Sequence, residues 1–142
     1  IGWIATLNQD VIRRVGEMKD YTTICCSAPS ECLATLALRH RSKLVERNLG
    51  IISANLEWLD GFFAAHADRF SWVKPRAGSI AFPRLLAGQV DGFTKMLVQE
   101  ASILLLPGSV FESEDSHFRI GFGRRSFPDA LEQLDGFLNK TR

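Results

Sequence analysis

The spacing of hydrophobic residues changes along this chain, and each spacing predicts a different element. Residues 1–6 are nearly all apolar, which favours a short strand buried on both faces. Apolar positions at helical spacing follow over residues 9–18 and predict a helix that Asn8 caps. Residues 21–26 are rich in β-forming types and predict an extended stretch.

Two further helices are expected next. Ser30 can cap a helix that runs to about residue 40. The strongest helical signal then covers residues 42–68, where one apolar stripe recurs at steps of four and three: Val45, Leu49, Ile52, Leu56, Leu59 and Phe63. This helix would be ~40 Å long at 1.5 Å per residue. Because that length exceeds a compact small domain, we expect the helix to bridge two structural layers or domains.

The last third of the chain alternates short strands with two helices. The predicted strands cover 70–74, 79–85, 103–106 and 117–124, and the predicted helices cover 90–100 and the residues after a capping box at 126–129. Pro83 indicates an edge strand. This order predicts an α+β fold with a mixed sheet. The first strand and helix lack neighbours, since a buried parallel strand needs partners on both sides.

Composition and charge narrow the classes of partner. The chain has 142 residues and a net charge of +1, so no basic surplus draws it to nucleic acid. No apolar run reaches the ~18 residues of a membrane helix, and the N-terminus does not resemble a signal peptide. The three cysteines read as thiols in a reducing cytosol, and their spacing with the histidines does not suit a metal site: Cys25, Cys26 and Cys32.

Arg119 is the residue whose setting best suits ligand binding. Strand alternation over 117–124 places Phe118, Ile120 and Phe122 on a core face and His117, Arg119, Gly121 and Gly123 on the other. Two glycines beside an arginine leave open space around its guanidinium, whose fork suits a carboxylate.

Simpler interpretations stay open for these residues. Arg119 could pair with an acidic residue of the expected loop at 112–116, namely Glu112, Glu114 or Asp115. The three histidines read as surface residues rather than general bases: His40, His66 and His117. Ser27, Pro29 and Ser30 suit a pocket or a plain helix-entry loop, and the turn at 107–109 likewise suits either role.

Several segments together resemble the C-terminal portion of class I/II aminotransferases, which adopt pyridoxal-phosphate fold type I. The family carries its Schiff-base lysine in an S-x-x-K motif followed by a glycine-rich stretch and R-x-G, which leads into a buried strand. Residues 1–5 are similar to the end of that run, starting immediately after its arginine. Residues 77–82 are similar to the family's glycine-plus-aromatic strand. The P-G-S-x-F segment at 107–111 and the F-R-I-G segment at 118–121 are similar to its last two strands.

The resemblance implies a domain plan and a set of site residues. Residues 1–41 would be the tail end of the large cofactor-binding domain, 42–69 the interdomain helix and 70–142 the small domain. Arg119 would anchor the substrate α-carboxylate, with Arg124 and Arg125 as competing candidates. A possible active-site loop set would be Ser27, Pro29, Ser30, Gly78 and Gly108, with the loop at 27–30 approaching the neighbouring subunit of a homodimer.

The resemblance also implies a chemistry. A cytoplasmic parent enzyme would use pyridoxal 5'-phosphate to move an amino group between an amino acid and a 2-oxo acid. We assign none of the lysines to the Schiff-base motif, so this chain would lack the catalytic lysine: Lys19, Lys43, Lys74, Lys95 and Lys140. Related reactions such as β-elimination or decarboxylation stay open. Two alternatives to an enzyme also stay open: a cofactor-sensing domain of a transcription regulator and a free-standing interaction domain.

Overall fold

The structure, a computed structural model, describes residues 1–113 and 116–141. It divides into two compact units, Ile1–Glu46 and Arg47–Arg142. The helices are α1 (Gln9–Thr22), α2 (Ala28–Arg39), α3 (Arg41–Ala65), α4 (Val90–Ala101), the 3₁₀ helix η1 (Gly108–Phe111) and α5 (Phe127–Lys140). The strands are β1 (Phe70–Ser71), β2 (Ile80–Ala81), β3 (Arg84–Leu85), β4 (Leu106–Pro107) and β5 (Phe118–Gly121). No helix in the described ranges is long and apolar enough to cross a membrane.

The first unit contains α1, α2 and the first turns of α3. Asn8 caps α1 as predicted, because its side-chain oxygen accepts from the backbone N–H groups of Asp10 and Val11 at 3.0 and 3.2 Å. The predicted cap at Ser30 is wrong, since α2 already begins after Ser27. Pro29 explains the earlier start: proline lacks an N–H and its fixed φ suits the first helical turn.

Two β predictions for the first unit are also wrong. Residues 1–6 form no strand, and apolar side chains such as Trp3 and Ile4 are exposed. A short strand has no hydrogen bonds of its own, so it forms only beside a partner strand. The expected extended stretch at 21–26 begins inside α1, which runs to Thr22 and ends where Ile24 adopts a left-handed φ of 57°.

The second unit is organised around the later turns of α3. Leu59 and Phe63 of the predicted stripe are buried, and Ile52 and Leu56 pack against the same core. Val45 and Leu49, at the start of the stripe, are exposed.

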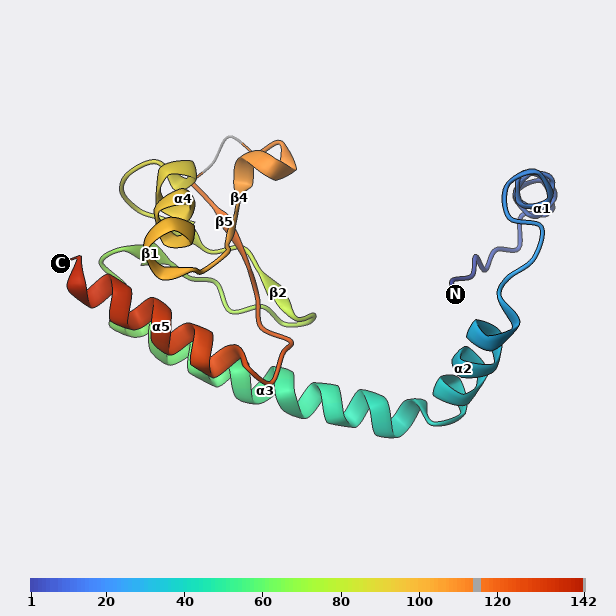
Figure 1. Cartoon of the computed structure of the whole chain (residues 1–142), viewed down its shortest axis with the longest axis horizontal. Helices are drawn as coiled ribbons and strands as arrows, with labels where there is room; N and C mark the ends of the chain where they lie inside the picture. Colours follow the sequence, from blue (N-terminus) through green and yellow to red (C-terminus); the bar gives the residue numbers. More distant parts are fainter. Residues whose placement is uncertain (114–115, 142) are drawn as a thin grey trace. The chain divides into compact units, whose positions relative to one another are not determined.

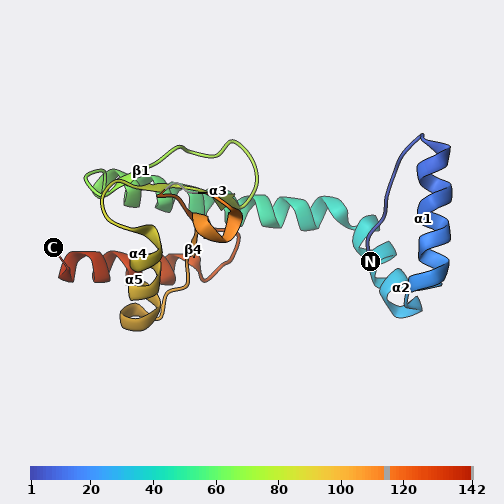
Figure 2. The same cartoon turned by 90° about the horizontal axis from the view of Figure 1, so that it is seen from above.

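Helix α5 runs alongside the second half of α3 (Figures 1 and 2). It buries Leu131, Leu134 and Leu138, whose spacing of three and four residues places them on one helix face. The expected capping box at its start is wrong, because Ser126 has a ψ of 9° rather than an extended backbone and its side chain makes no cap hydrogen bond.

Every strand pair in the described ranges is antiparallel, which corrects the expected mixed sheet. β1 pairs with β3, and a second sheet has the order β2-β5-β4. The expected strand at 79–85 divides into β2 and β3 around Pro83, which has no N–H to donate. The carbonyl of Pro83 still accepts from the Phe118 N–H at 3.0 Å, so both halves follow β5.

One buried polar side chain ties α3 to the end of β5. The amide nitrogen of Asn55 donates to the carbonyls of Phe122 and Arg124 at 2.8 and 2.7 Å. Asn55 is 3% exposed, and its contact with Phe122 is buried, whereas its contact with Arg124 is partly buried. The contact therefore fixes where β5 leaves the sheet.

We predict that Asn55→Leu lowers the free energy of unfolding by about 1–3 kcal/mol, because it removes the donor of the buried Phe122 carbonyl. The Arg124 carbonyl also loses this bond but still accepts from the Phe127 N–H at 3.2 Å. Asn48→Leu is the matched control, since Asn48 lies on the exposed part of the same helix and its change should stay within about 0.5 kcal/mol. Urea unfolding followed by circular dichroism measures both. Equal stability of the two variants would contradict the assigned role.

Candidate functional site

The central strand β5 separates a core face from an open face. Phe118, Ile120 and Phe122 are each at most 4% exposed, so they form the core face predicted from the sequence. Arg119 occupies an alternate position on the open face and is half-buried. The alternation therefore directs the Arg119 side chain away from the core.

The guanidinium of Arg119 lies beside an aromatic group. Its Cζ atom is 5.9 Å from the centroid of the Phe111 ring, within the range of a cation–π contact. Phe111 meets Phe82 edge to face at 6.1 Å, and Phe82 stacks on His117 at 5.3 Å. These three residues, Phe82, Phe111 and His117, are called the aromatic array below.

Acidic partners for Arg119 were the competing interpretation. Within residues 1–113 and 116–141, no ion pair joins Arg119 to a carboxylate, Glu112 included. Glu114 and Asp115 lie outside the described residues, so the pairing with either stays untested. Arg124 and Arg125 follow β5 and are exposed.

The two glycines of the open face differ. A Cβ atom at Gly121 would meet nothing within 4 Å, which agrees with the predicted space beside Arg119. A Cβ atom at Gly123 would lie 3.0 Å from the Cβ of Ser79, so here the prediction of open space is wrong. Gly123 instead permits close approach of the segment before β2, where the Phe122 N–H donates to the Ser79 carbonyl at 2.8 Å.

The predicted loop residues fall into two groups. Gly78 has a left-handed φ of 82° and precedes β2, which pairs with β5 through Ile80 and Gly121. Gly108 lies on the other side of β5, and its N–H donates to the His117 carbonyl at 2.7 Å. The structure thus brings Gly78 and Gly108 to the sheet that carries Arg119. The other three predicted loop residues lie in the first unit, at the start of α2, and are Ser27, Pro29 and Ser30.

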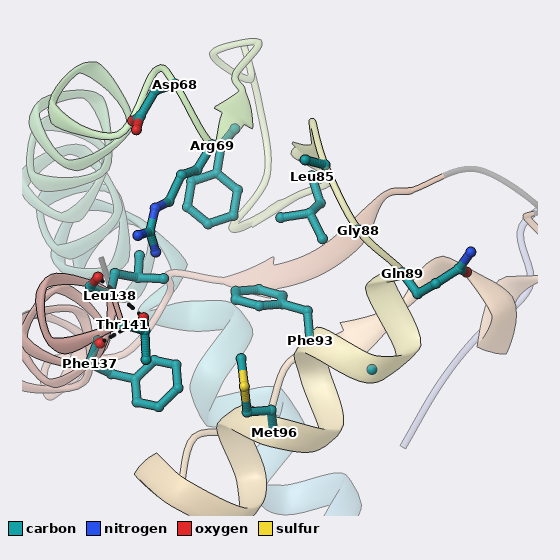
Figure 3. Close-up of a pocket in the computed structure, with 13 residues that line it drawn as sticks. Asp68, Arg69, Leu85, Gly88, Gln89, Phe93, Met96, Phe137, Leu138 and Thr141 are labelled. Atoms are coloured by element: carbon teal, nitrogen blue, oxygen red, sulfur yellow. Dashed lines mark hydrogen bonds between the residues drawn. The ribbon is translucent and has the colours of Figure 1, made fainter.

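Two cavities of the second unit lie elsewhere. A cavity of about 630 Å³ is lined by Arg69, Phe93 and Met96 among others, and Figure 3 shows these side chains around it. A groove of about 840 Å³ lies between α3 and α5, beside Trp58. Arg119 lines neither of them, and it does not line the smaller cavity of about 210 Å³ that Ile120 and Gly121 border.

The comparison with protein families identifies the family of this chain. The model of the family "Aminotransferase class I and II" matches residues 1–127. This chain belongs to that family. The match includes the four segments on which the resemblance is based, at 1–5, 77–82, 107–111 and 118–121.

Similar proteins support the same assignment. Capreomycidine synthase from Streptomyces vinaceus is 32% identical over 127 residues, which are 86% of this chain and 31% of that protein. A PLP-dependent aminotransferase from Streptococcus suis is 31% identical, with a TM-score of 0.82 over 95% of this chain and 36% of that one. The PLP-dependent cyclase OrfR is 29% identical, with a TM-score of 0.83 over 94% of this chain and 37% of that one. The chain therefore spans about a third of each relative.

The fold class is confirmed as that of the fold-type-I pyridoxal-phosphate enzymes. Cystalysin from Treponema denticola, whose structure contains a pyridoxal 5'-phosphate cofactor, is only 15% identical but superposes with a TM-score of 0.84. At that identity the likeness concerns the fold alone. Together with the family match, it establishes an aminotransferase-like protein whose relatives use this cofactor.

The residues of this chain do not by themselves fit the cofactor. Its aldehyde needs a lysine amine held in a pocket. Residues 71–74 also have the sequence S-x-x-K. Lys74, however, forms an ion pair with the Asp60 carboxylate, so its amine is not held in a cofactor pocket. The Lys74 hydrogen bond, helped by one from Trp72, holds the pKa of Asp60 below its ordinary value of 3.8, although burial acts in the opposite direction. Neither the cavity at Phe93 nor the groove at Trp58 is lined by a lysine. Lys19 does line a cavity of the first unit, but its Nζ donates to Cys26 Sγ at 3.5 Å.

Sequence reasoning overlooked two features of this region. The sequence pattern places Phe111 only within the 107–111 segment and does not indicate that its ring lies beside Arg119. His66 was expected at the surface, but it is 5% exposed and its Nε2 lies 2.6 Å from Asp135 Oδ1 on α5. A histidine one turn after Phe62 and Phe63 could have indicated this burial.

We predict that alanine destabilises the protein at Gly123 but not at Gly121, the two glycines of the open face. Gly123→Ala should lower the free energy of unfolding by about 1–3 kcal/mol, because the new methyl group meets Ser79 across a fixed backbone hydrogen bond. Gly121→Ala should stay within about 0.5 kcal/mol, since its methyl group enters open space. Thermal and urea unfolding measure both variants, and a Gly123→Ala protein as stable as Gly121→Ala would contradict the close contact.

Proposed function

We propose that this chain is the C-terminal part of a pyridoxal-phosphate-dependent aminotransferase, and that Arg119 binds the α-carboxylate of its amino acid substrate. The reaction moves an amino group between an amino acid and a 2-oxo acid. The observation that carries the proposal is the placement of a guanidinium on the open face of β5. When bound, the cofactor supplies the electron sink of the reaction.

The chemistry of Arg119 supports this role. Its five N–H donors lie in one plane and match the two oxygens of a carboxylate. No described carboxylate occupies those donors, and Gly121 leaves space beside them. Arg124 is the weaker candidate, because it follows the strand end and is exposed.

The remaining parts of the proposal concern the whole enzyme. The chain spans about a third of its relatives, so we propose that the Schiff-base lysine lies in another part of the protein. Residues 1–41 would be the tail end of the large domain, 42–69 the interdomain helix and 70–142 the small domain. Ser27, Pro29 and Ser30 would approach the active site of the second subunit in a cytoplasmic homodimer.

A second candidate reaction has its own support. Capreomycidine synthase and OrfR, two of the most similar proteins, are a synthase and a cyclase by name rather than aminotransferases. A cyclase that acts on an amino acid needs the same carboxylate anchor, so Arg119 would keep its role. The two reactions differ in whether a 2-oxo acid is consumed. The alternative of a cofactor-sensing regulator would bind amino acids without turnover.

We predict that Arg119→Lys in the full-length enzyme lowers kcat/KM for its amino acid by roughly ten- to a hundredfold, because lysine keeps the charge but loses one charge-assisted hydrogen bond of the fork. Cofactor absorbance should not change. Arg124→Lys is the matched control and should act like the unaltered enzyme. Steady-state kinetics with a panel of amino acids and 2-oxoglutarate measures both. If Arg124→Lys were the impaired variant, the assignment of Arg119 would be wrong.

We also predict that the 142-residue chain alone forms no lysine adduct with pyridoxal 5'-phosphate at a single site. Lys74 is ion-paired, Lys19 in the first unit donates to Cys26, and among the described residues no lysine lines the three cavities of the second unit. Borohydride reduction followed by peptide mass mapping measures this. Slow, scattered modification of several lysines is the expected background. One stoichiometric site would place the Schiff-base lysine within this chain.

A further inference from the structure

Phe111 sits where it can control the orientation of Arg119. The Cζ atom of Arg119 lies 5.9 Å from the centroid of the Phe111 ring. We propose that Phe111 is a positioning residue, whose ring holds the guanidinium so that its fork faces the substrate carboxylate. This inference rests on the proposed function of Arg119 and deepens it.

The backbone around Phe111 is tied to the strand that carries Arg119. Phe111 ends the 3₁₀ helix η1, which begins at Gly108. The Gly108 N–H donates to the His117 carbonyl at 2.7 Å, and the Ser113 N–H donates back to the Gly108 carbonyl at 3.1 Å. The ring and the guanidinium are thus placed by segments hydrogen-bonded to each other.

The rest of the aromatic array contacts the same Phe111 ring. Phe82 meets Phe111 at an interplanar angle of 84°, and Phe82 in turn stacks on His117 at 6°. His117 is two residues before Arg119, on the same face of β5. The array therefore links the ring beside Arg119 to the residue two positions before Arg119, which limits movement of the Phe111 ring.

A ring suits this task better than an acidic side chain would. A carboxylate partner would accept hydrogen bonds from the guanidinium and compete with the substrate for the same donors. A ring attracts the cation through its π electrons and accepts no strong hydrogen bond. Phe111 can therefore restrict the long arginine side chain while leaving its N–H donors available to a carboxylate.

The test measures carboxylate binding separately from amine binding, in the full-length enzyme with its cofactor. Propanoate and ethylamine, the deaminated and decarboxylated forms of alanine, serve as competitive inhibitors. Phe111→Leu should weaken propanoate binding by about five- to thirtyfold and lower kcat/KM for the best amino acid similarly. Ethylamine binding should not change. Phe111→Tyr keeps the ring and should stay within about twofold. Phe137→Leu, which changes a ring at the cavity of Figure 3, is the matched control.

A double-mutant cycle separates positioning from a general structural effect. In an Arg119→Lys background the fork is gone, so Phe111→Leu should cost far less than it does in the unaltered enzyme. Ring-fluorinated phenylalanines at position 111 provide a second series that barely changes side-chain shape. Propanoate binding should weaken with each added fluorine, because fluorine withdraws the π electrons.

The outcomes distinguish this inference from the proposed function. If Arg119→Lys impairs turnover but Phe111→Leu and the fluorinated series leave propanoate binding and kcat/KM unchanged, the positioning role is wrong and the anchor stands. An equal loss from Phe111→Leu in both backgrounds would also overturn the positioning role. If Arg119→Lys turns over like the unaltered enzyme, the anchor itself is wrong.

Discussion

The burial of alternate residues in β5 is the constraint on which the rest of the second unit depends. The ring of Phe118 packs against Phe70 and Phe93 at centroid distances of 5.7 and 6.0 Å, and Ile120 and Phe122 continue the same face. Since side chains alternate along a strand, a shift of one residue would bury Arg119 and expose three large apolar groups. The direction of the proposed carboxylate anchor is therefore a consequence of core packing.

The two units differ in how much of their apolar surface is covered. Within the first unit, α1 and α2 contain no buried residue, and Leu7 is almost fully exposed. The second unit encloses a core of leucines and phenylalanines from α3, α4, α5 and β5. This difference suits the proposal that residues 1–41 complete a larger domain, because an exposed apolar helix face gains stability only against a partner.

The sequence predicted those elements whose signal is carried by their own residues. Helical spacing identified α3 and α5, and alternation identified the two faces of β5. Predictions that depended on a partner failed: residues 1–6 have no neighbouring strand, and the expected strand at 79–85 is divided at Pro83.

The same limit explains what was missed at the candidate site. The sequence predicts open space at Gly123, but in the structure Ser79 lies against it. Phe111 is eight residues from Arg119 in sequence, and only the pairing of β4 with β5 brings the two together. Local chemistry thus predicted the arginine and its face, whereas the surrounding side chains depended on strand pairing.

We propose that the open face of β5 binds the substrate carboxylate through Arg119. A crystal structure of the full-length enzyme with its amino acid substrate bound tests it most directly. We predict that both carboxylate oxygens accept hydrogen bonds from the Arg119 guanidinium at about 2.7–2.9 Å, with Phe111 still against the guanidinium. A carboxylate held by Arg124, Arg69 or residues of another segment would contradict the claim.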